Sequence, residues 1–213
     1  MTPDLIEQTI GYIKEKLEKE YSGHDYFHVL RVYKMATRIA VSEGADVEAV
    51  GLAALLHDVD DRKLSPETHQ TQGNARAYLT SKGVDGDKIE KICQIISQVS
   101  FSSNDSPPST TEGKCVQDAD RLDAIGAVGI ARAFAYGGHH GRHIYHPDIK
   151  PNLNMTKEEY SKSESTTINH FYEKLFKLKA LMNTRTAIKI AERREVYMRE
   201  FVSEFLDEWE GKR

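Results

Sequence analysis

The sequence predicts an all-α fold, arranged as one domain in which a helical bundle carries two long loops. Apolar residues recur at i, i+3 and i+4 along most of the 213 residues, which is the spacing of one helix face. No stretch alternates β-branched and polar residues, and no Asn-Gly or Asp-Gly pair joins two such stretches as a hairpin would require. A chain of this length fits a single domain.

The apolar spacing places the predicted helices in order along the chain. They cover residues 5–17, 29–40, 47–60, 70–82, 86–100, 115–136, 158–181 and 184–209. Asp46 and Asp85 precede two of these helices as N-cap residues, and His24 is expected to cap the helix that contains His28. Residues 47–56 carry a single charge, so we expect that helix to be buried on all sides.

Two long polar stretches separate the later helices. Residues 101–113 contain a Pro-Pro pair, and residues 137–155 are rich in histidine and glycine. Because loops longer than about 12–15 residues in a compact domain are commonly functional, both are expected to serve the protein's activity.

Composition excludes several classes of function. The chain has 29 basic and 33 acidic residues, and this net charge of −4 does not suit a nucleic-acid-binding protein. It has no apolar run long enough to span a membrane and no N-terminal signal sequence, so a cytoplasmic protein is expected. Two cysteines without a CxxC motif cannot form a zinc finger or a disulfide framework.

Potential metal ligands lie in three separate segments. His28 begins one predicted helix, and His57-Asp58 directly follows the apolar helix. Charged groups beside a buried helix must be paired or must bind a metal, although a simple polar helix cap is the alternative. Acidic residues at 118, 120 and 123 precede another apolar run, where they could instead be a solvated helix start.

Together the segments offer two imidazoles and at least two carboxylates. Such a mixed nitrogen and oxygen set suits Mn²⁺, Fe²⁺, Co²⁺, Ni²⁺ or Zn²⁺ better than Ca²⁺. Asp118 and Asp120 face different sides of a helix, so only one of them can join the set, and the spacing alone leaves both open.

The pattern H…HD…D on helices resembles the HD superfamily of metal-dependent phosphohydrolases. The segments GHDYFHVLRV, ALLHDVDDRK, QDADRLDAIGAVGIARAF and TTINHFYEKLFKLKALMNT are similar to its bacterial YedJ/YpgQ-type branch. The resemblance covers nearly the whole chain. It implies a single HD domain over residues 1–213, with a core at about 20–136 and C-terminal helices at about 158–209 packed on it.

The resemblance also implies the ligands of one divalent transition metal. They would be His28, His57, Asp58 and Asp120, since the last ligand of the superfamily follows an alanine in an Ala-Asp step. Asp118 remains the alternative. Which of Mn²⁺, Ni²⁺, Co²⁺, Fe²⁺ or Zn²⁺ is bound is left open.

Further catalytic roles follow from the same resemblance. Several relatives carry Glu three residues after the HD aspartate, where this chain has Asp61. We expect Asp61 to act as general base beside His57 and Asp58. Asp60 is the neighbouring alternative, although a helix would turn it away from the metal.

Binding of substrate phosphates requires cations near the metal. Arg31, Arg142 and Lys174 are the candidates, because each lies close to one of the motifs. Four histidines of the second loop could be substrate contacts, surface residues or a second metal site; they are His139, His140, His143 and His146. His170 lies on an otherwise apolar helix, where a core histidine is expected.

The expected function is hydrolysis of a nucleotide, most specifically of a nucleoside triphosphate to a monophosphate and pyrophosphate. Alternatives are hydrolysis of another phosphate mono- or diester, or a metal-binding nucleotide sensor without catalysis. The expected partner is a small nucleotide and neither nucleic acid nor a membrane. The oligomeric state is open, with a homodimer as one option.

Overall fold

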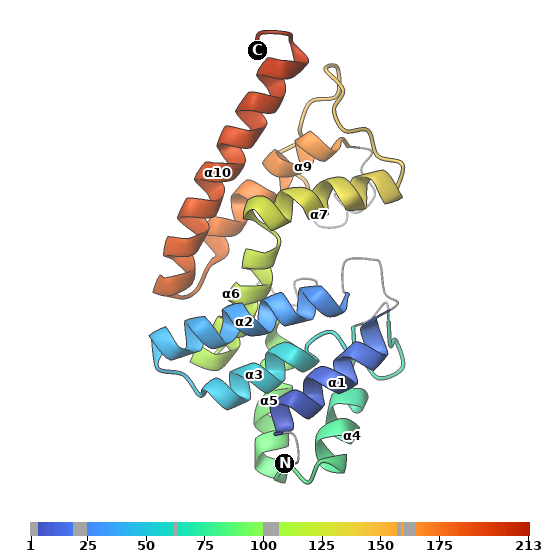
Figure 1. Cartoon of the computed structure of the whole chain (residues 1–213), viewed down its shortest axis with the longest axis vertical. Helices are drawn as coiled ribbons and strands as arrows, with labels where there is room; N and C mark the ends of the chain where they lie inside the picture. Colours follow the sequence, from blue (N-terminus) through green and yellow to red (C-terminus); the bar gives the residue numbers. More distant parts are fainter. Residues whose placement is uncertain (1–3, 19–24, 62–63, 100–106, 157–158, 160–164) are drawn as a thin grey trace. The chain divides into compact units, whose positions relative to one another are not determined.

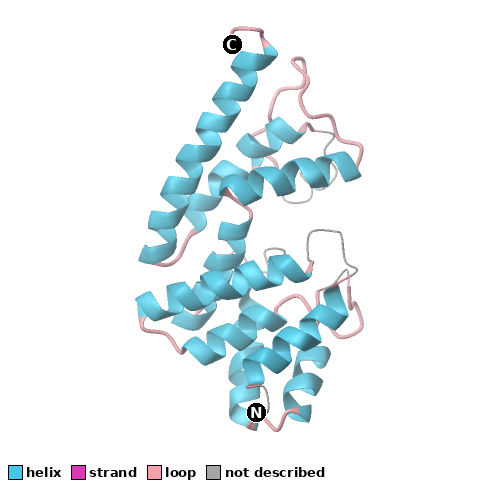
Figure 2. Cartoon of the chain, in the orientation of Figure 1, coloured by secondary structure: helices cyan, strands magenta, loops and turns pink. Residues whose placement is uncertain are grey.

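The protein is described from a computed structural model that covers residues 4–18, 25–61, 64–99, 107–156, 159 and 165–213. Over these ranges its regular structure is helical throughout, without a strand, which confirms the all-α prediction (Figure 2). The helices are α1 Leu5–Leu17, α2 Tyr26–Glu43, α3 Val47–Leu56, α4 Gly73–Ser81, α5 Gly86–Val99, α6 Thr111–Asp123, α7 Gly126–His139, α9 Thr167–Glu173, the 3₁₀ helix η1 Leu175–Leu181 and α10 Arg185–Trp209. None of the helices in these ranges is both long and apolar enough to cross a lipid bilayer.

The chain forms two compact units. The first unit contains residues 1–120 and 183–187, and the second contains residues 121–182 and 188–213. Each unit has its own buried core and is described by itself below. The prediction of a single domain stays a prediction.

Helix α3 is the centre of the first unit. It contacts α1, α2 and α5 (Figure 1), and every residue from Ala49 to Leu56 is buried. The Asp46 side chain accepts a hydrogen bond of 3.0 Å from the Ala49 N–H and so caps the helix as predicted. Burial on all sides is therefore confirmed from Ala49 to Leu56, where the segment is uncharged, whereas Val47 and Glu48 at the start of the helix are exposed.

Three other helices of the first unit, α1, α2 and α5, begin at carboxylate caps. Asp4 caps α1, Asp25 caps α2, and the Asp85 side chain accepts from the Asp87 N–H at the start of α5. His24, the sequence-predicted cap of α2, lies outside the described residues. Helix α2 ends at Gly44, whose left-handed conformation suits glycine.

Helix α3 is shorter than predicted. It ends at Leu56, and His57 to Asp60 form turns instead of continuing the helix to residue 60. The turns are held by i to i+3 hydrogen bonds, from Val59 N–H to Leu56 C=O and from Asp61 N–H to Asp58 C=O. An apolar core offers no hydrogen-bond partners to the polar residues that follow this buried segment. The chain therefore leaves the helix axis at this point.

The predicted helix at 115–136 is two helices in the structure. Helix α6 begins at Thr111, within the predicted loop 101–113, and ends at Asp123, before α7 begins at Gly126. Gly126 has a positive φ of 80°, and a Cβ atom on Gly129 would lie 2.3 Å from the Ala124 carbonyl oxygen. The corner thus requires both glycines, which the apolar periodicity concealed.

The predicted helix over residues 158–181 also differs from the structure. Instead of one helix over residues 158–181, α9 and η1 meet at Lys174, whose φ of −134° lies outside the helical range. Residues 157–158 and 160–164 lie outside the described residues. Helix α10 agrees with the predicted 184–209, whereas α7 extends to His139 into the predicted loop at 137–155.

Aromatic side chains form much of the core of the second unit. Phe171 on α9 is fully buried, and its ring lies 6.0–6.2 Å from those of Phe134, Phe176 and Phe201. Ring centroids at such separations are those of packed aromatic pairs. This cluster joins α7, α9 and α10 within the unit.

The glycine corner gives a test of the fold. Gly129→Ala should lower the free energy of unfolding by about 2–3 kcal/mol, because the added methyl group overlaps a backbone carbonyl that cannot move aside easily. The matched control is Gly11→Ala in the middle of α1, where nothing lies within 4 Å of the added Cβ. That control should raise stability by about 0.5–1 kcal/mol. Urea denaturation followed by circular dichroism measures both; equal effects would contradict the proposed clash.

Candidate metal centre

His28 is placed by the first turn of α2. Asp25 accepts a 2.7 Å hydrogen bond from the His28 backbone N–H, which fixes the start of the helix. The His28 side chain is only 2% exposed. A buried imidazole at a capped helix start is held in one orientation toward its neighbours.

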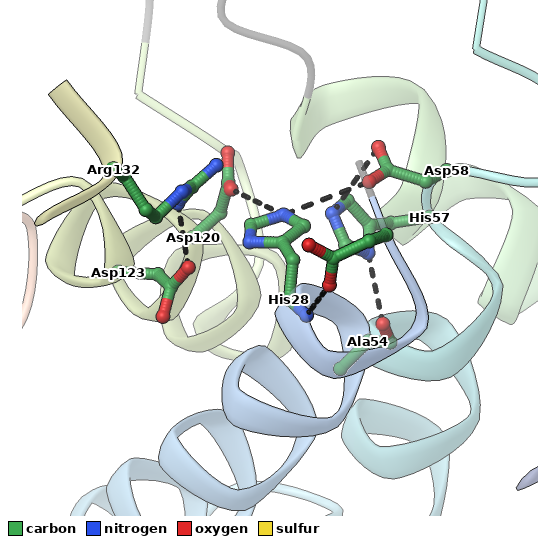
Figure 3. Close-up of polar contacts among 8 residues, drawn as sticks. His28, Ala54, His57, Asp58, Asp120, Asp123 and Arg132 are labelled. Carbon is green, nitrogen blue, oxygen red and sulfur yellow. Dashed lines mark hydrogen bonds and ion pairs between the residues drawn. The ribbon is translucent and has the colours of Figure 1, made fainter. Parts of the chain in front are cut away.

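His57 and Asp58 follow the last turn of α3. The His57 Nδ1 atom lies 2.8 Å from the Ala54 carbonyl oxygen (Figure 3). A carbonyl oxygen only accepts hydrogen bonds, so Nδ1 carries the ring proton and Nε2 presents its lone pair. This is the arrangement by which metal-binding histidines are commonly oriented.

The side chains of His28, His57 and Asp58 converge (Figure 3). His28 Nε2 lies 3.6 Å from Asp58 Oδ2, and His57 Nε2 lies 3.3 Å from Asp58 Oδ1. One potential ligand atom from each of the three lies within 4.8 Å of the other two. The structure thus brings together three of the four sequence-predicted metal ligands, one from the start of α2 and two from the turn that follows α3.

Asp120 on α6 approaches the same imidazole. Its Oδ1 atom lies 3.4 Å from His28 Nε2 (Figure 3). Burial raises the pKa of Asp120, but the hydrogen bond with His28 and the nearby imidazole of His57 outweigh it and hold the pKa below its ordinary value. The Asp120 carboxylate is therefore ionised and directed toward the histidines.

Asp118 lies away from this group and has a different task. It is fully buried, and its two oxygens accept from the backbone N–H and side chain of both Asn183 and Thr184, at 2.7–2.8 Å. Burial raises the pKa of Asp118, and these four hydrogen bonds offset part of the rise. Asp118 thereby fixes the chain where it enters α10.

The donor set fits a divalent transition metal. Bonds of about 2.0–2.1 Å to imidazole nitrogen and carboxylate oxygen would place adjacent ligand atoms of one ion about 3 Å apart. The observed separations of 3.3–3.6 Å are close to this value. Two neutral imidazoles with two carboxylates would supply the charge that neutralises such a cation.

The two acidic residues after Asp58 are placed differently. Asp60 is 3% exposed, and its oxygens accept from the Asn74 and Ala75 N–H groups at 3.0 Å. Its carboxylate therefore serves the start of α4. Asp61 is half-buried and lies beyond the helix, so the helical spacing by which Asp60 was expected to turn away from the metal does not apply to this segment. A turn hydrogen bond of 3.1 Å from Asp61 N–H to Asp58 C=O relates the two residues instead.

The predicted phosphate-binding cations lie in different units. Arg31 is half-buried on α2, one turn after His28, in the unit that contains the candidate metal centre. Arg142 and Lys174 belong to the second unit, where both lie near His170. Burial, and then the charges of Lys174 and Arg142, lower the pKa of His170 to about 3, so this histidine is neutral at physiological pH.

Within the described residues, the four loop histidines do not bring three potential ligand atoms together. Among the described residues, only His28, His57 and Asp58 bring three potential ligand atoms together. His140 instead stacks on Tyr136 at 3.9 Å, and the His143 and His146 rings lie 6.1 Å apart. His139 is exposed at the end of α7.

Two polar residues near the centre were missed from the sequence. His69 is half-buried, and its Nδ1 atom lies 2.9 Å from the Asp60 carbonyl oxygen. Asn74 lies at the start of α4, where an asparagine is common and its sequence position carries no functional signal. Only the folded positions of these side chains reveal their contacts.

Comparison with known proteins identifies the class of protein that this fold and site define. Residues 25–125, which include all four predicted ligands, match the HD domain family. The chain is 39% identical over 199 residues to the protein YpgQ of Bacillus subtilis. The matched residues make up 92% of this chain and 89% of YpgQ. The chain therefore belongs to the HD domain family, and it is a metal-dependent phosphohydrolase of the HD superfamily.

Solved structures agree with this assignment over nearly the whole chain. A Lactobacillus plantarum protein has a TM-score of 0.83 and 45% identity and covers 99% of both chains. An HD-superfamily hydrolase of Bacillus thuringiensis has a TM-score of 0.78 and 42% identity, covering 96% of both chains. YpgQ in complex with ADP has a TM-score of 0.74 and 32% identity, covering 95% of this chain and 96% of that one.

The contrast between Asp120 and Asp118 can be measured. Asp120→Asn should weaken manganese binding at least tenfold. Removal of a residue that only orients a ligand already costs about 10- to 100-fold in metal affinity, and removal of a ligand itself should cost at least as much. Asp118→Asn should leave manganese affinity within about threefold, yet it should lower the free energy of unfolding by about 2 kcal/mol, since an amide N–H would face buried donors. Isothermal titration calorimetry and urea denaturation test the pair. Loss of manganese binding in Asp118→Asn alone would reverse the assignment.

Proposed function

We propose that this enzyme hydrolyses nucleotides, most specifically nucleoside triphosphates to monophosphate and pyrophosphate. The observation that carries the nucleotide part is the complex of the related YpgQ with ADP. The cleavage between the α- and β-phosphates is proposed from the resemblance to the YpgQ-type branch. The group of two histidines and two aspartates supports a single metal-assisted hydrolysis.

His28, His57, Asp58 and Asp120 are the proposed metal ligands. A divalent ion bound there would lower the pKa of a water molecule and polarise the phosphoryl oxygen. The buried positions of His28 and Asp58 keep their donor atoms fixed, and the hydrogen bond from His57 to Ala54 keeps its Nε2 atom available. The chain therefore supplies a pre-oriented set of ligand atoms.

Asp61 is the proposed general base. Its position one turn after Asp58 leaves it near the ligand segment, while Asp60 is occupied by the N–H groups of α4. Asp61 would take the proton from the water that attacks the phosphorus atom in line. His57 and Asp58 would orient that water through their position at the end of α3.

Arg31, Arg142 and Lys174 are the proposed phosphate-binding residues. Phosphoryl transfer depends mostly on positioning and on neutralising charge on the phosphate oxygens. Arg142 and Lys174 share a neighbour, the neutral His170, which can contribute a hydrogen bond without adding charge. Each alanine variant of Arg31, Arg142 and Lys174 should raise KM several-fold, and steady-state kinetics on each would show which of them contacts the substrate.

A substrate screen tests the proposed reaction. Nucleoside mono-, di- and triphosphates are incubated with the Mn²⁺-loaded protein, and the release of phosphate and of pyrophosphate is measured separately. Pyrophosphate from triphosphates supports the proposal, whereas phosphate alone would favour a phosphomonoesterase. Hydrolysis of a cyclic nucleotide would favour a phosphodiesterase. Nucleotide binding without any hydrolysis would favour a sensor.

The role of Asp61 gives a kinetic prediction. Asp61→Asn should lower kcat by about 10²–10⁴, because asparagine can hold a water molecule but cannot accept its proton. Manganese content, measured by mass spectrometry of the purified protein, should remain that of the wild type. The control is Asp148→Asn, an exposed carboxylate in the loop of the second unit. A change below about threefold in both variants would remove Asp61 from the mechanism.

A further inference from the structure

The segment between Asp58 and α4 is organised around two side chains, Asp60 and Asn74. Helix α4 lacks a cap of its own, because the preceding residue, Gln72, has a left-handed backbone with φ 53° and makes no side-chain capping bond. Asp60 supplies the cap from earlier in the chain, through its hydrogen bonds from the N–H groups of Asn74 and Ala75. A carboxylate at a helix N-terminus is favoured by the helix dipole as well.

Asn74 returns the contact. Its Nδ2 atom lies 3.1 Å from the carbonyl oxygen of Val59, the residue between Asp58 and Asp60. The same amide lies 3.2 Å from Ser65 Oγ and 3.0 Å from Thr68 Oγ1. The side chain of Asp60 thus holds the backbone of Asn74, and the side chain of Asn74 holds the backbone of Val59. We refer to this reciprocal contact as the Asp60–Asn74 clasp.

A third contact closes the clasp. His69 Nδ1 lies 2.9 Å from the carbonyl oxygen of Asp60 and must donate to it, because a carbonyl only accepts. The backbone carbonyls of Val59 and Asp60, the two residues after Asp58, are therefore both held by side chains from the loop and from α4. The clasp restrains the peptide units on which the position of Asp58 depends.

We propose that Asn74 is a positioning residue of the metal centre, and that the Asp60–Asn74 clasp holds the turn after Asp58 so that its carboxylate lies beside His28 and His57. The inference rests on the proposed metal ligands. The end of α3 fixes only the N-terminal side of His57-Asp58, and the i to i+3 turns that follow are weak by themselves. The clasp supplies the restraint on the C-terminal side.

The role of Asn74 is separable from a general effect on stability. Asn74→Ala should weaken Mn²⁺ binding by the apo-protein about 10- to 100-fold, the usual effect of removing a group that orients a metal ligand. The matched control is Thr9→Val, which removes a buried hydrogen bond from Tyr78 in the same unit. Thr9→Val should lower the thermal unfolding midpoint about as much as Asn74→Ala does. Its Mn²⁺ affinity should nevertheless stay within about twofold of the wild type.

Titration calorimetry and thermal unfolding of the apo-proteins decide between the outcomes. If Asn74→Ala loses no more Mn²⁺ affinity than Thr9→Val, the positioning role is wrong. If the wild type itself binds no Mn²⁺, the proposed metal site fails, which is a different result.

A milder pair of variants covers the case in which Asn74→Ala does not fold. His69→Asn keeps a side-chain donor close to the position of Nδ1, whereas His69→Ala removes it. His69→Asn should therefore retain more of the wild-type Mn²⁺ affinity than His69→Ala. Equal wild-type affinity in both variants would overturn the clasp as a determinant of the site.

Discussion

The complete burial of helix α3 from Ala49 to its end is the constraint on which the candidate site depends. Its residues from Ala49 to Leu56 are enclosed by the core of the first unit, so the polar pair that follows begins in a nearly dry environment. A charged or hydrogen-bonding side chain in such a place needs a fixed partner. His57 finds the Ala54 carbonyl oxygen, and Asp58 finds the imidazoles of His28 and His57. The same burial that stabilises the helix therefore brings together and orients the group of potential ligand atoms.

Aspartate side chains fix the starts of several other helices. Asp25 sets the start of α2 and with it the place of His28, whereas Asp46 sets the start of α3. Asp60 does the same for α4 across a loop, and Asp118 holds Asn183 and Thr184 where α10 begins. Each carboxylate satisfies backbone N–H groups that no helix can pair internally. The acidic residues of this chain thus divide between positioning helices and facing the proposed cation.

This division explains why neighbouring aspartates have different tasks. Asp58, Asp60 and Asp61 follow one another closely, yet their surroundings differ. Asp58 lies beside two imidazoles, and Asp60 caps the start of a helix. Asp61 is half-buried beyond the end of α3. Asp118 and Asp120 are likewise separated by a single residue, and only Asp120 approaches His28. The acidic side chains that lie away from the proposed metal ligands instead hold the backbone at helix starts.

The amino-acid sequence by itself determined the helical class, the buried character of α3, the cap at Asp46 and the ligand candidates. These follow from local spacing and from residue chemistry, and the resemblance of the H…HD…D segments gave the family. The candidates His28, His57, Asp58 and Asp120 follow from this resemblance without any knowledge of their contacts.

Only the tertiary structure decided the breaks and the long-range partners. The corner at Gly126 and Gly129 depends on a close approach to a carbonyl, which an apolar pattern does not record. The different surroundings of Asp118 and Asp120 depend on Asn183 and Thr184, which hold Asp118 from more than sixty residues away in the chain. The clasp between Asp60 and Asn74 joins a turn to the start of another helix. Such contacts arise when separate segments pack together, so no local period or spacing can encode them.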